Sequence, residues 1–146
     1  MPLNQKVLWD DKYSIGIKTI DNQHKKLFDL VNALYDLEDD DYEVKEKLRK
    51  ILYDFSDYMK IHFKNEENYM LSIDFPYLEQ HQQIHNDIIK SLNDIIQTPA
   101  KLNIIKSKMR IVAKRYLIDH IQQEDIKIKE YVEKSDKEKI FKISDV

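Results

Sequence analysis

The chain has 146 residues, and its 24 basic and 27 acidic side chains are interspersed to a formal net charge of -3. This balance excludes the basic surface expected of a nucleic-acid-binding protein, and no apolar run approaches the ~20 residues that span a bilayer. Cysteine is absent, which excludes disulfides, thiolate metal sites and Fe–S clusters, and the first residues lack the apolar core of a signal peptide. One glycine and three prolines are typical of long helices, so the composition predicts a single soluble, cytoplasmic, all-α domain over residues 1–146.

The first predicted helix follows an extended N-terminal arm. Residues 1–18 show no helical period, and Trp9 within them is expected to cover one end of the domain. Thr19 is expected to cap the first helix, and Asp41, at the end of an acidic run, to cap the second. The inward stripe of the first helix contains His24 and four aliphatic residues at the spacing of one helix face: Ile20, Leu27, Val31 and Leu34.

The second and third predicted helices each carry a pair of possible metal ligands four residues apart. His62 and Glu66 continue the apolar stripe of the second helix, and the proline-containing segment 74–76 separates it from the third. His81 and His85 lie on the inward stripe of the third helix. Since residues i and i+4 are neighbours on a helix surface, each pair points to one spot.

The fourth predicted helix completes the fold. Thr98 followed by Pro99 predicts its start, because a capping residue often precedes a proline in the first helical turn. A capping-box pattern further along predicts a separate short terminal helix over residues 135–143. Four amphipathic helices with short connections predict an antiparallel up-down-up-down four-helix bundle over residues 19–132.

The spacing of His120 and Asp125 does not fit a regular α-helix. Residues five apart differ by about 140° around the helix axis, so Glu124 would be the better-placed partner of His120. The apolar stripe also shifts its phase between Tyr116 and Ile121. A one-residue π-bulge between Ile121 and Glu124 would explain both observations, and such bulges favour functional sites.

All five histidines of the chain fall into one pattern with two carboxylates. The members of this pattern are His24, His62, Glu66, His81, His85, His120 and Asp125. A lone core histidine is usually structural, and H-x-x-x-E is common on surface helices. Burying the whole set without a metal, however, would be very costly. Seven groups suit two carboxylate-bridged metal ions. Zinc fits less well because its structural sites close with four ligands, and the Glu-x-x-His spacing of ferritin-like proteins does not organise these histidines.

These motifs resemble the hemerythrin family, in particular its single-domain bacterial members, over nearly the whole chain. They are Ile20-Asp21-Asn22-Gln23-His24, His62-Phe63-x-x-Glu66-Glu67, His81-x-x-x-His85 and His120-Ile121-x-x-x-Asp125. The resemblance implies a non-haem di-iron centre with an oxo or hydroxo bridge that binds dioxygen reversibly. The ligands implied for one iron are His81, His85 and His120, those for the other are His24 and His62, and the bridging carboxylates are Glu66 and Asp125.

Dioxygen would bind, by the same resemblance, at the open position of the two-histidine iron, in an apolar pocket that excludes water and slows autoxidation. The candidate walls of this pocket are Leu27, Phe28, Phe63, Leu117 and Ile121, with Tyr58 or Tyr116 as further candidates. The implied role is an oxygen carrier, store or delivery protein rather than an enzyme. Three alternatives remain open: sensing through a separate protein partner, handling of peroxide or nitric oxide at the same centre, and an iron reservoir.

Overall fold

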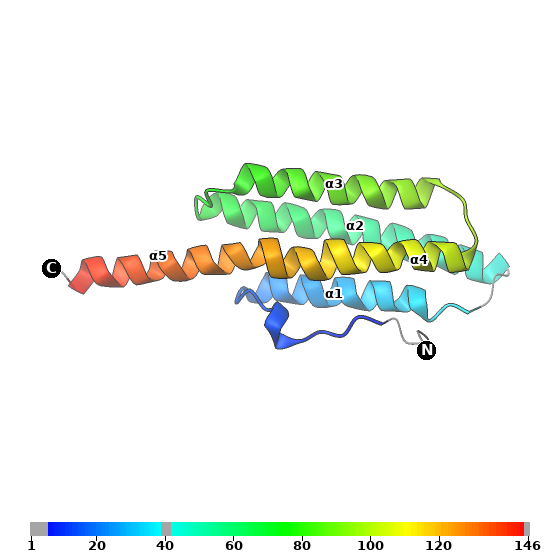
Figure 1. Ribbon diagram of the computed structural model, residues 1–146, viewed down its shortest axis with the longest axis horizontal. Helices are drawn as coiled ribbons and strands as arrows, with labels where there is room; N and C mark the ends of the chain where they lie inside the picture. Colours follow the sequence, from blue (N-terminus) through cyan, green and yellow to red (C-terminus); the bar gives the residue numbers. More distant parts are fainter. Residues whose placement is uncertain (1–5, 39–41, 145–146) are drawn as a thin grey trace.

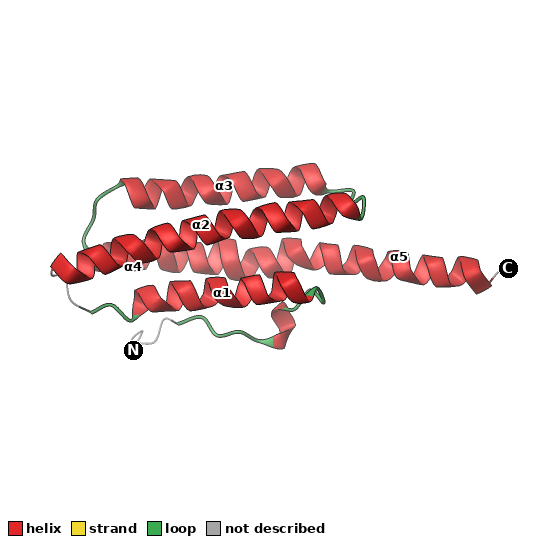
Figure 2. Cartoon of the chain, turned by 180° about the vertical axis from the view of Figure 1, so that it is seen from behind, coloured by secondary structure: helices red, strands yellow, loops and turns green. Residues whose placement is uncertain are grey.

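The computed structural model describes residues 6–38 and 42–144, with side chains described for residues 6–38 and 43–136. A short 3-10 helix (Asp11–Tyr13) and three α-helices, α1 (Lys18–Tyr35), α2 (Tyr42–Ser72) and α3 (Leu78–Gln97), precede a long further helix, which we call the fourth helix (Figures 1 and 2). The segments of the fourth helix are α4 (Leu102–Val112), two π-helical stretches (Ala113–Asp119 and Ile121–Asp125) and α5 (Ile126–Ser144). Helix α1 packs against α2 and α4, and α3 packs against α2 and α4, so the predicted antiparallel four-helix bundle is confirmed.

The core is formed by the inward stripes that the 3.6-residue period predicts. Leu27 and Leu34 of α1, Met59 of α2 and Ile88 of α3 have no measurable exposure to solvent. Each of these helices is polar on its other face, so the helices bury one side against their neighbours and keep the other in water. The bundle therefore presents four buried faces to a common axis.

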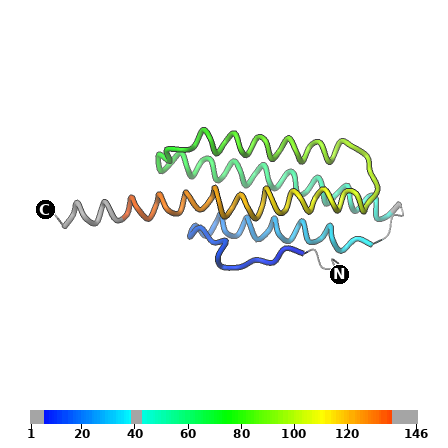
Figure 3. The backbone as a smooth tube through the Cα atoms, in the orientation of Figure 1, coloured from blue at the N-terminus to red at the C-terminus, as the bar shows by residue number. Residues whose placement is uncertain are grey.

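The N-terminal arm lies along the side of α1 rather than over an end of the bundle (Figure 3). The backbone N–H and C=O of Val7 both hydrogen-bond the side chain of Asn32, each at 2.8 Å. The ring of Trp9 lies 5.7 Å from that of Phe28, and Lys25 stacks over it. The expectation that Trp9 covers the end of the domain is therefore wrong, because the arm runs antiparallel to α1 and brings the indole onto its flank.

Two of the predicted helix starts are displaced. Helix α1 begins at Lys18, so Thr19 lies inside its first turn, and Asp21 instead fastens the arm by accepting hydrogen bonds from the Ile15 N–H and the Ser14 hydroxyl. Thr98 follows the end of α3, and α4 begins only at Leu102. Residues 98–101 thus form a connection between the helices. The predicted cap Asp41 lies outside the described residues.

Helix α5 extends past the ends of the other helices (Figure 1). It runs unbroken through Ser135 to Ser144, so the prediction of a separate terminal helix over residues 135–143 is wrong. The capping-box pattern does not start a new helix here, because α5 continues through it. The residues before the pattern contain neither glycine nor proline, which would break the hydrogen-bond ladder of α5. No helix in the part of the chain that the structure describes is both long and apolar enough to cross a membrane.

Candidate metal centre

All seven residues of the predicted pattern meet in the middle of the bundle. Helix α1 supplies His24, α2 supplies His62 and Glu66, α3 supplies His81 and His85, and the fourth helix supplies His120 and Asp125. None of the seven is more than 6% exposed, and both carboxylates are completely buried. We refer to these seven side chains as the central cluster.

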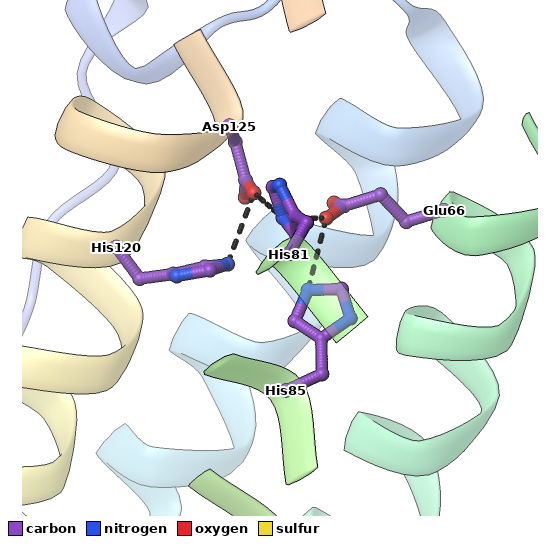
Figure 4. Close-up of side chains that lie close together, drawn as sticks. All are labelled: Glu66, His81, His85, His120 and Asp125. Carbon is purple, nitrogen blue, oxygen red and sulfur yellow. Dashed lines mark ion pairs between the residues drawn. The ribbon is translucent and has the colours of Figure 1, made fainter. Parts of the chain in front are cut away.

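The central cluster divides into two overlapping groups, each with its ligand atoms within 4.8 Å of one another. The larger group contains three imidazoles and both carboxylates, and Figure 4 shows these side chains converging from α2, α3 and the fourth helix. The smaller group contains two imidazoles and the same two carboxylates. The groups are Glu66, His81, His85, His120, Asp125 and His24, His62, Glu66, Asp125.

Each carboxylate directs one oxygen to each group. Glu66 Oε1 lies 2.9 Å from His81 Nε2 and 3.1 Å from His85 Nε2, whereas its Oε2 lies 3.3 Å from His62 Nε2. The two oxygens of Asp125 divide in the same way. Asp125 Oδ1 lies 2.9 Å from His81 Nε2 and 3.0 Å from His120 Nε2, and Oδ2 lies 3.1 Å from His24 Nε2. Both side chains therefore have the geometry of bridging carboxylates.

The atoms of the cluster are close together but do not hydrogen-bond one another. Among the described residues, twelve buried side-chain nitrogen and oxygen atoms lack a hydrogen-bond partner, and all but those of Tyr35 and Ser56 belong to the cluster. An unsatisfied buried polar atom costs about 1–3 kcal/mol, and more when charged. Neighbouring ligands at about 2.1 Å from an octahedral ion are about 3.0 Å apart, which is close to most of the separations found here. The donor set therefore fits metal ions at shared points between these atoms.

A π-helical stretch places Asp125 beside His120. The N–H of Ile126 donates to the carbonyl of Ile121, five residues earlier, so the predicted π-bulge is confirmed. This wider turn brings residues five apart to the same side of the helix. Glu124 instead faces outward and pairs with Lys127 at 3.1 Å. The first π-helical stretch, over Ala113–Asp119, was not predicted.

Charge in the cluster is balanced between carboxylates and imidazoles. Burial and the neighbouring Asp125 raise the pKa of Glu66, but its contacts with three imidazoles outweigh them and hold it well below its usual range. Burial lowers the pKa of His62. Burial also disfavours a charged His81, yet the two carboxylates beside it raise its pKa to about 10. Without a metal, protons on imidazoles balance the carboxylates, and a bound cation would take over this role.

Two polar residues that the sequence reasoning missed orient histidines of the cluster. His62 Nδ1 donates to Gln23 Oε1 at 2.8 Å, and His85 Nδ1 donates to Glu67 Oε2 at 2.7 Å. These bonds direct the Nε2 atom of each ring into the cluster, as outer partners of metal-binding histidines do. Gln23 and Glu67 directly adjoin cluster residues in the chain, so they could have been suggested from the sequence, but each serves a histidine on a neighbouring helix.

A narrow apolar hollow, with no free space for a water molecule, adjoins the central cluster beside His24, His62 and His120. Leu27, Phe63, Leu117 and Ile121 line it as predicted, together with Tyr116 and with Met59, which was not predicted. Phe28 does not line the hollow. It follows Leu27 by one residue, which turns it about 100° around α1, and its ring packs against Trp9 and Tyr13 instead.

Comparison with known proteins agrees with this geometry. Residues 15–132 match the family described as the hemerythrin HHE cation binding domain. A bacteriohemerythrin of Campylobacter jejuni is 32% identical over 134 residues, which cover 91% of this chain and 96% of that protein. A bacteriohemerythrin of Clostridium acetobutylicum is 34% identical over 87 residues (58% of this chain and 67% of that protein). One from Pseudomonas paraeruginosa is 24% identical over 119 residues (82% and 76%).

Proposed function

Since the chain belongs to the hemerythrin family, we propose that it binds dioxygen reversibly at a centre of two non-haem iron ions held by the central cluster. The observation that carries this proposal is the division of each carboxylate between two groups of imidazoles. Glu66 and Asp125 each direct one oxygen to one group and the other oxygen to the second group. This arrangement suits a pair of metal ions, because with a single metal ion one oxygen of each carboxylate would have no metal to bind.

The two groups would hold their metal ions unequally. One iron would be held by His81, His85 and His120, the other by His24 and His62, with both carboxylates shared. The first ion would then have five protein ligand atoms and the second four. Five and four ligands from imidazole and carboxylate suit iron or manganese better than a closed structural zinc site. The second ion would keep more room for an exogenous ligand, on the side where the apolar hollow lies.

Two irons held by the central cluster would supply the electrons for reversible dioxygen binding. The protein's own side chains keep water and anions away from the open position beside His24 and His62. Leu27, Phe63 and Ile121 present hydrocarbon surface to the hollow, and Gln23 holds the ring of His62 at its edge. Apolar walls of this kind disfavour the entry of a charged competitor, because a buried ion without a partner is costly.

The lining of the hollow favours a binding protein over an enzyme. Apart from the proposed ligands, its described lining consists of hydrocarbon side chains, the thioether of Met59 and the ring of Tyr116. No further carboxylate or imidazole of that lining could act as a general acid or base. We therefore propose a carrier, storage or delivery role. Sensing through a protein partner and the handling of peroxide or nitric oxide at the same centre are the competing functions.

The test is an optical spectrum of the iron-loaded protein with iron quantified on the same sample. The protein is reduced without oxygen and then exposed to air. We expect about two irons per chain, a colourless reduced form, and visible bands that appear with dioxygen and disappear under argon. Direct conversion to an oxidised spectrum that argon does not reverse would contradict reversible binding. Turnover of added peroxide or nitric oxide would favour the competing enzymatic function.

A further inference from the structure

A second hollow is lined by residues of α2, the end of α3, the connection that follows it and α4. These segments meet at the end of the bundle away from the projecting part of α5 (Figure 1). It has a volume of about 370 Å³ and shares no lining residue with the central cluster or its apolar hollow. Small-molecule sites in proteins usually enclose about 300–1,000 Å³. We call this feature the end pocket.

The floor of the end pocket is a part of the hydrophobic core that is not fully covered. Leu48, Leu52, Ile95 and Ile105 line it and are 6–9% exposed, whereas core residues such as Leu27 and Ile88 have no measurable exposure. Burial of apolar surface is favourable by roughly 25 cal/mol of free energy for each Å² removed from water. A hydrocarbon chain in the pocket would complete the core at this end of the bundle.

The rim of the end pocket carries two positive charges. Lys45 and Arg49 line it and are exposed, and they lie four residues apart on α2, so their side chains are neighbours. Among the side chains that the structure describes, no carboxylate lies within ion-pair distance of either, and no acidic residue lines the pocket. Two like charges at this spacing destabilise a helix slightly, and an anion between them would reverse that effect.

We propose that the end pocket binds an amphipathic carboxylate, a fatty acid of medium chain length. Its hydrocarbon chain lies on the floor of Leu48, Leu52 and Ile95, and its carboxylate accepts hydrogen bonds from the Arg49 guanidinium and the Lys45 ammonium. The planar guanidinium matches a carboxylate in two-point contact, and such charge-assisted bonds are stronger than neutral ones. The pocket has the volume of a small-molecule site, which favours a free fatty acid over a protein helix or a membrane surface.

Isothermal titration of the iron-loaded protein with sodium decanoate tests this proposal. We expect one decanoate per chain, with a melting temperature that rises with ligand concentration, because a ligand that binds only the folded state stabilises it. The double variant Lys45→Gln/Arg49→Gln should weaken binding about tenfold or more. Ala100→Leu, which fills the pocket and keeps both charges, should weaken it as well. Lys26→Gln/Lys47→Gln, with the same change in net charge on exposed residues outside the pocket, should bind decanoate like the parent protein.

Several results would overturn the proposal. They are the absence of saturable decanoate binding, equal affinity for decanoate and the neutral decanol, and a double variant that binds like the parent. Binding to phosphatidylglycerol vesicles without binding of free decanoate would show a membrane-facing surface in place of a fatty-acid site. The end pocket is independent of the metal centre, so these results stand whether or not the protein binds dioxygen.

Discussion

Replacing Glu67 with Gln should weaken iron binding at the three-histidine position. Glu67 Oε2 accepts the Nδ1–H of His85 at 2.7 Å, and the side chain is only 21% exposed. The amide of Gln keeps an oxygen acceptor in nearly the same place, so the substitution removes the negative charge and leaves the hydrogen bond. Bonds to a charged group contribute about 1.5–3 kcal/mol and neutral ones about 0.5–1.5 kcal/mol.

The difference between the two kinds of bond, about 1 kcal/mol after allowance for partial exposure, corresponds to a roughly fivefold loss of affinity for iron at this position. Glu67→Ala, which leaves His85 Nδ1 without its acceptor, should lose about 10–100-fold. The assay is competition with a ferrous chelator, followed by the release of each iron over time. Half of the iron should leave faster from the variants, and the rest should leave nearly as in the parent.

Glu46→Gln is the matched control, because it removes the same charge from an exposed position of the same helix. Iron release from Glu67→Ala that equals release from the parent and from this control would refute the positioning role of Glu67. If both irons are instead released faster by the same factor, the substitution loosens the whole bundle.

Three further outcomes are expected. Removal of iron by chelation should lower the melting temperature, because eight buried ligand atoms of the cluster, the Nε2 atoms of four histidines and the four carboxylate oxygens, then lose the metal. Equal melting temperatures with and without iron, measured by circular dichroism, would contradict a metal-stabilised core. The metal-free protein should also lose stability as the pH rises from about 6.5 to about 10. The pKa of His81 is raised from 6.5 to about 10 in the folded state, so the stability it contributes, at most about 5 kcal/mol, is complete below pH 6.5 and is lost as His81 deprotonates. Thermal melts across this range should show a fall for the metal-free protein and a much smaller one for the iron-loaded protein. Finally, Leu27→Asn places an amide in the hollow beside the two-histidine group and should speed autoxidation of the oxygenated form, which is followed by its visible bands. Leu30→Asn, on the same helix outside the hollow, is the control. Equal autoxidation rates in the two variants would argue against a wall role for Leu27.

The sequence by itself determined the bundle and which residues point into it. Hydrophobic residues and histidines share one stripe on each helix, and the helical period then forces both inward together. The mismatch between the stripe and the i,i+5 step from His120 to Asp125 was also visible, because a regular α-helix cannot bring both inward. This is why the π-helical stretch could be predicted from spacing alone.

Other features depended on how the helices pack. Phe28 is as apolar as Leu27, yet it faces the arm and not the hollow, since the arm occupies the flank of α1. Gln23 and Glu67 lie next to cluster residues in the chain but bond histidines of adjacent helices. The division of the Glu66 and Asp125 oxygens between two groups of imidazoles likewise depends on the relative heights of all four helices. Periodicity sets the direction of a side chain around its own helix. The partner of that side chain across the core depends on the rotation and axial position of the neighbouring helix, which only the packed tertiary structure decides.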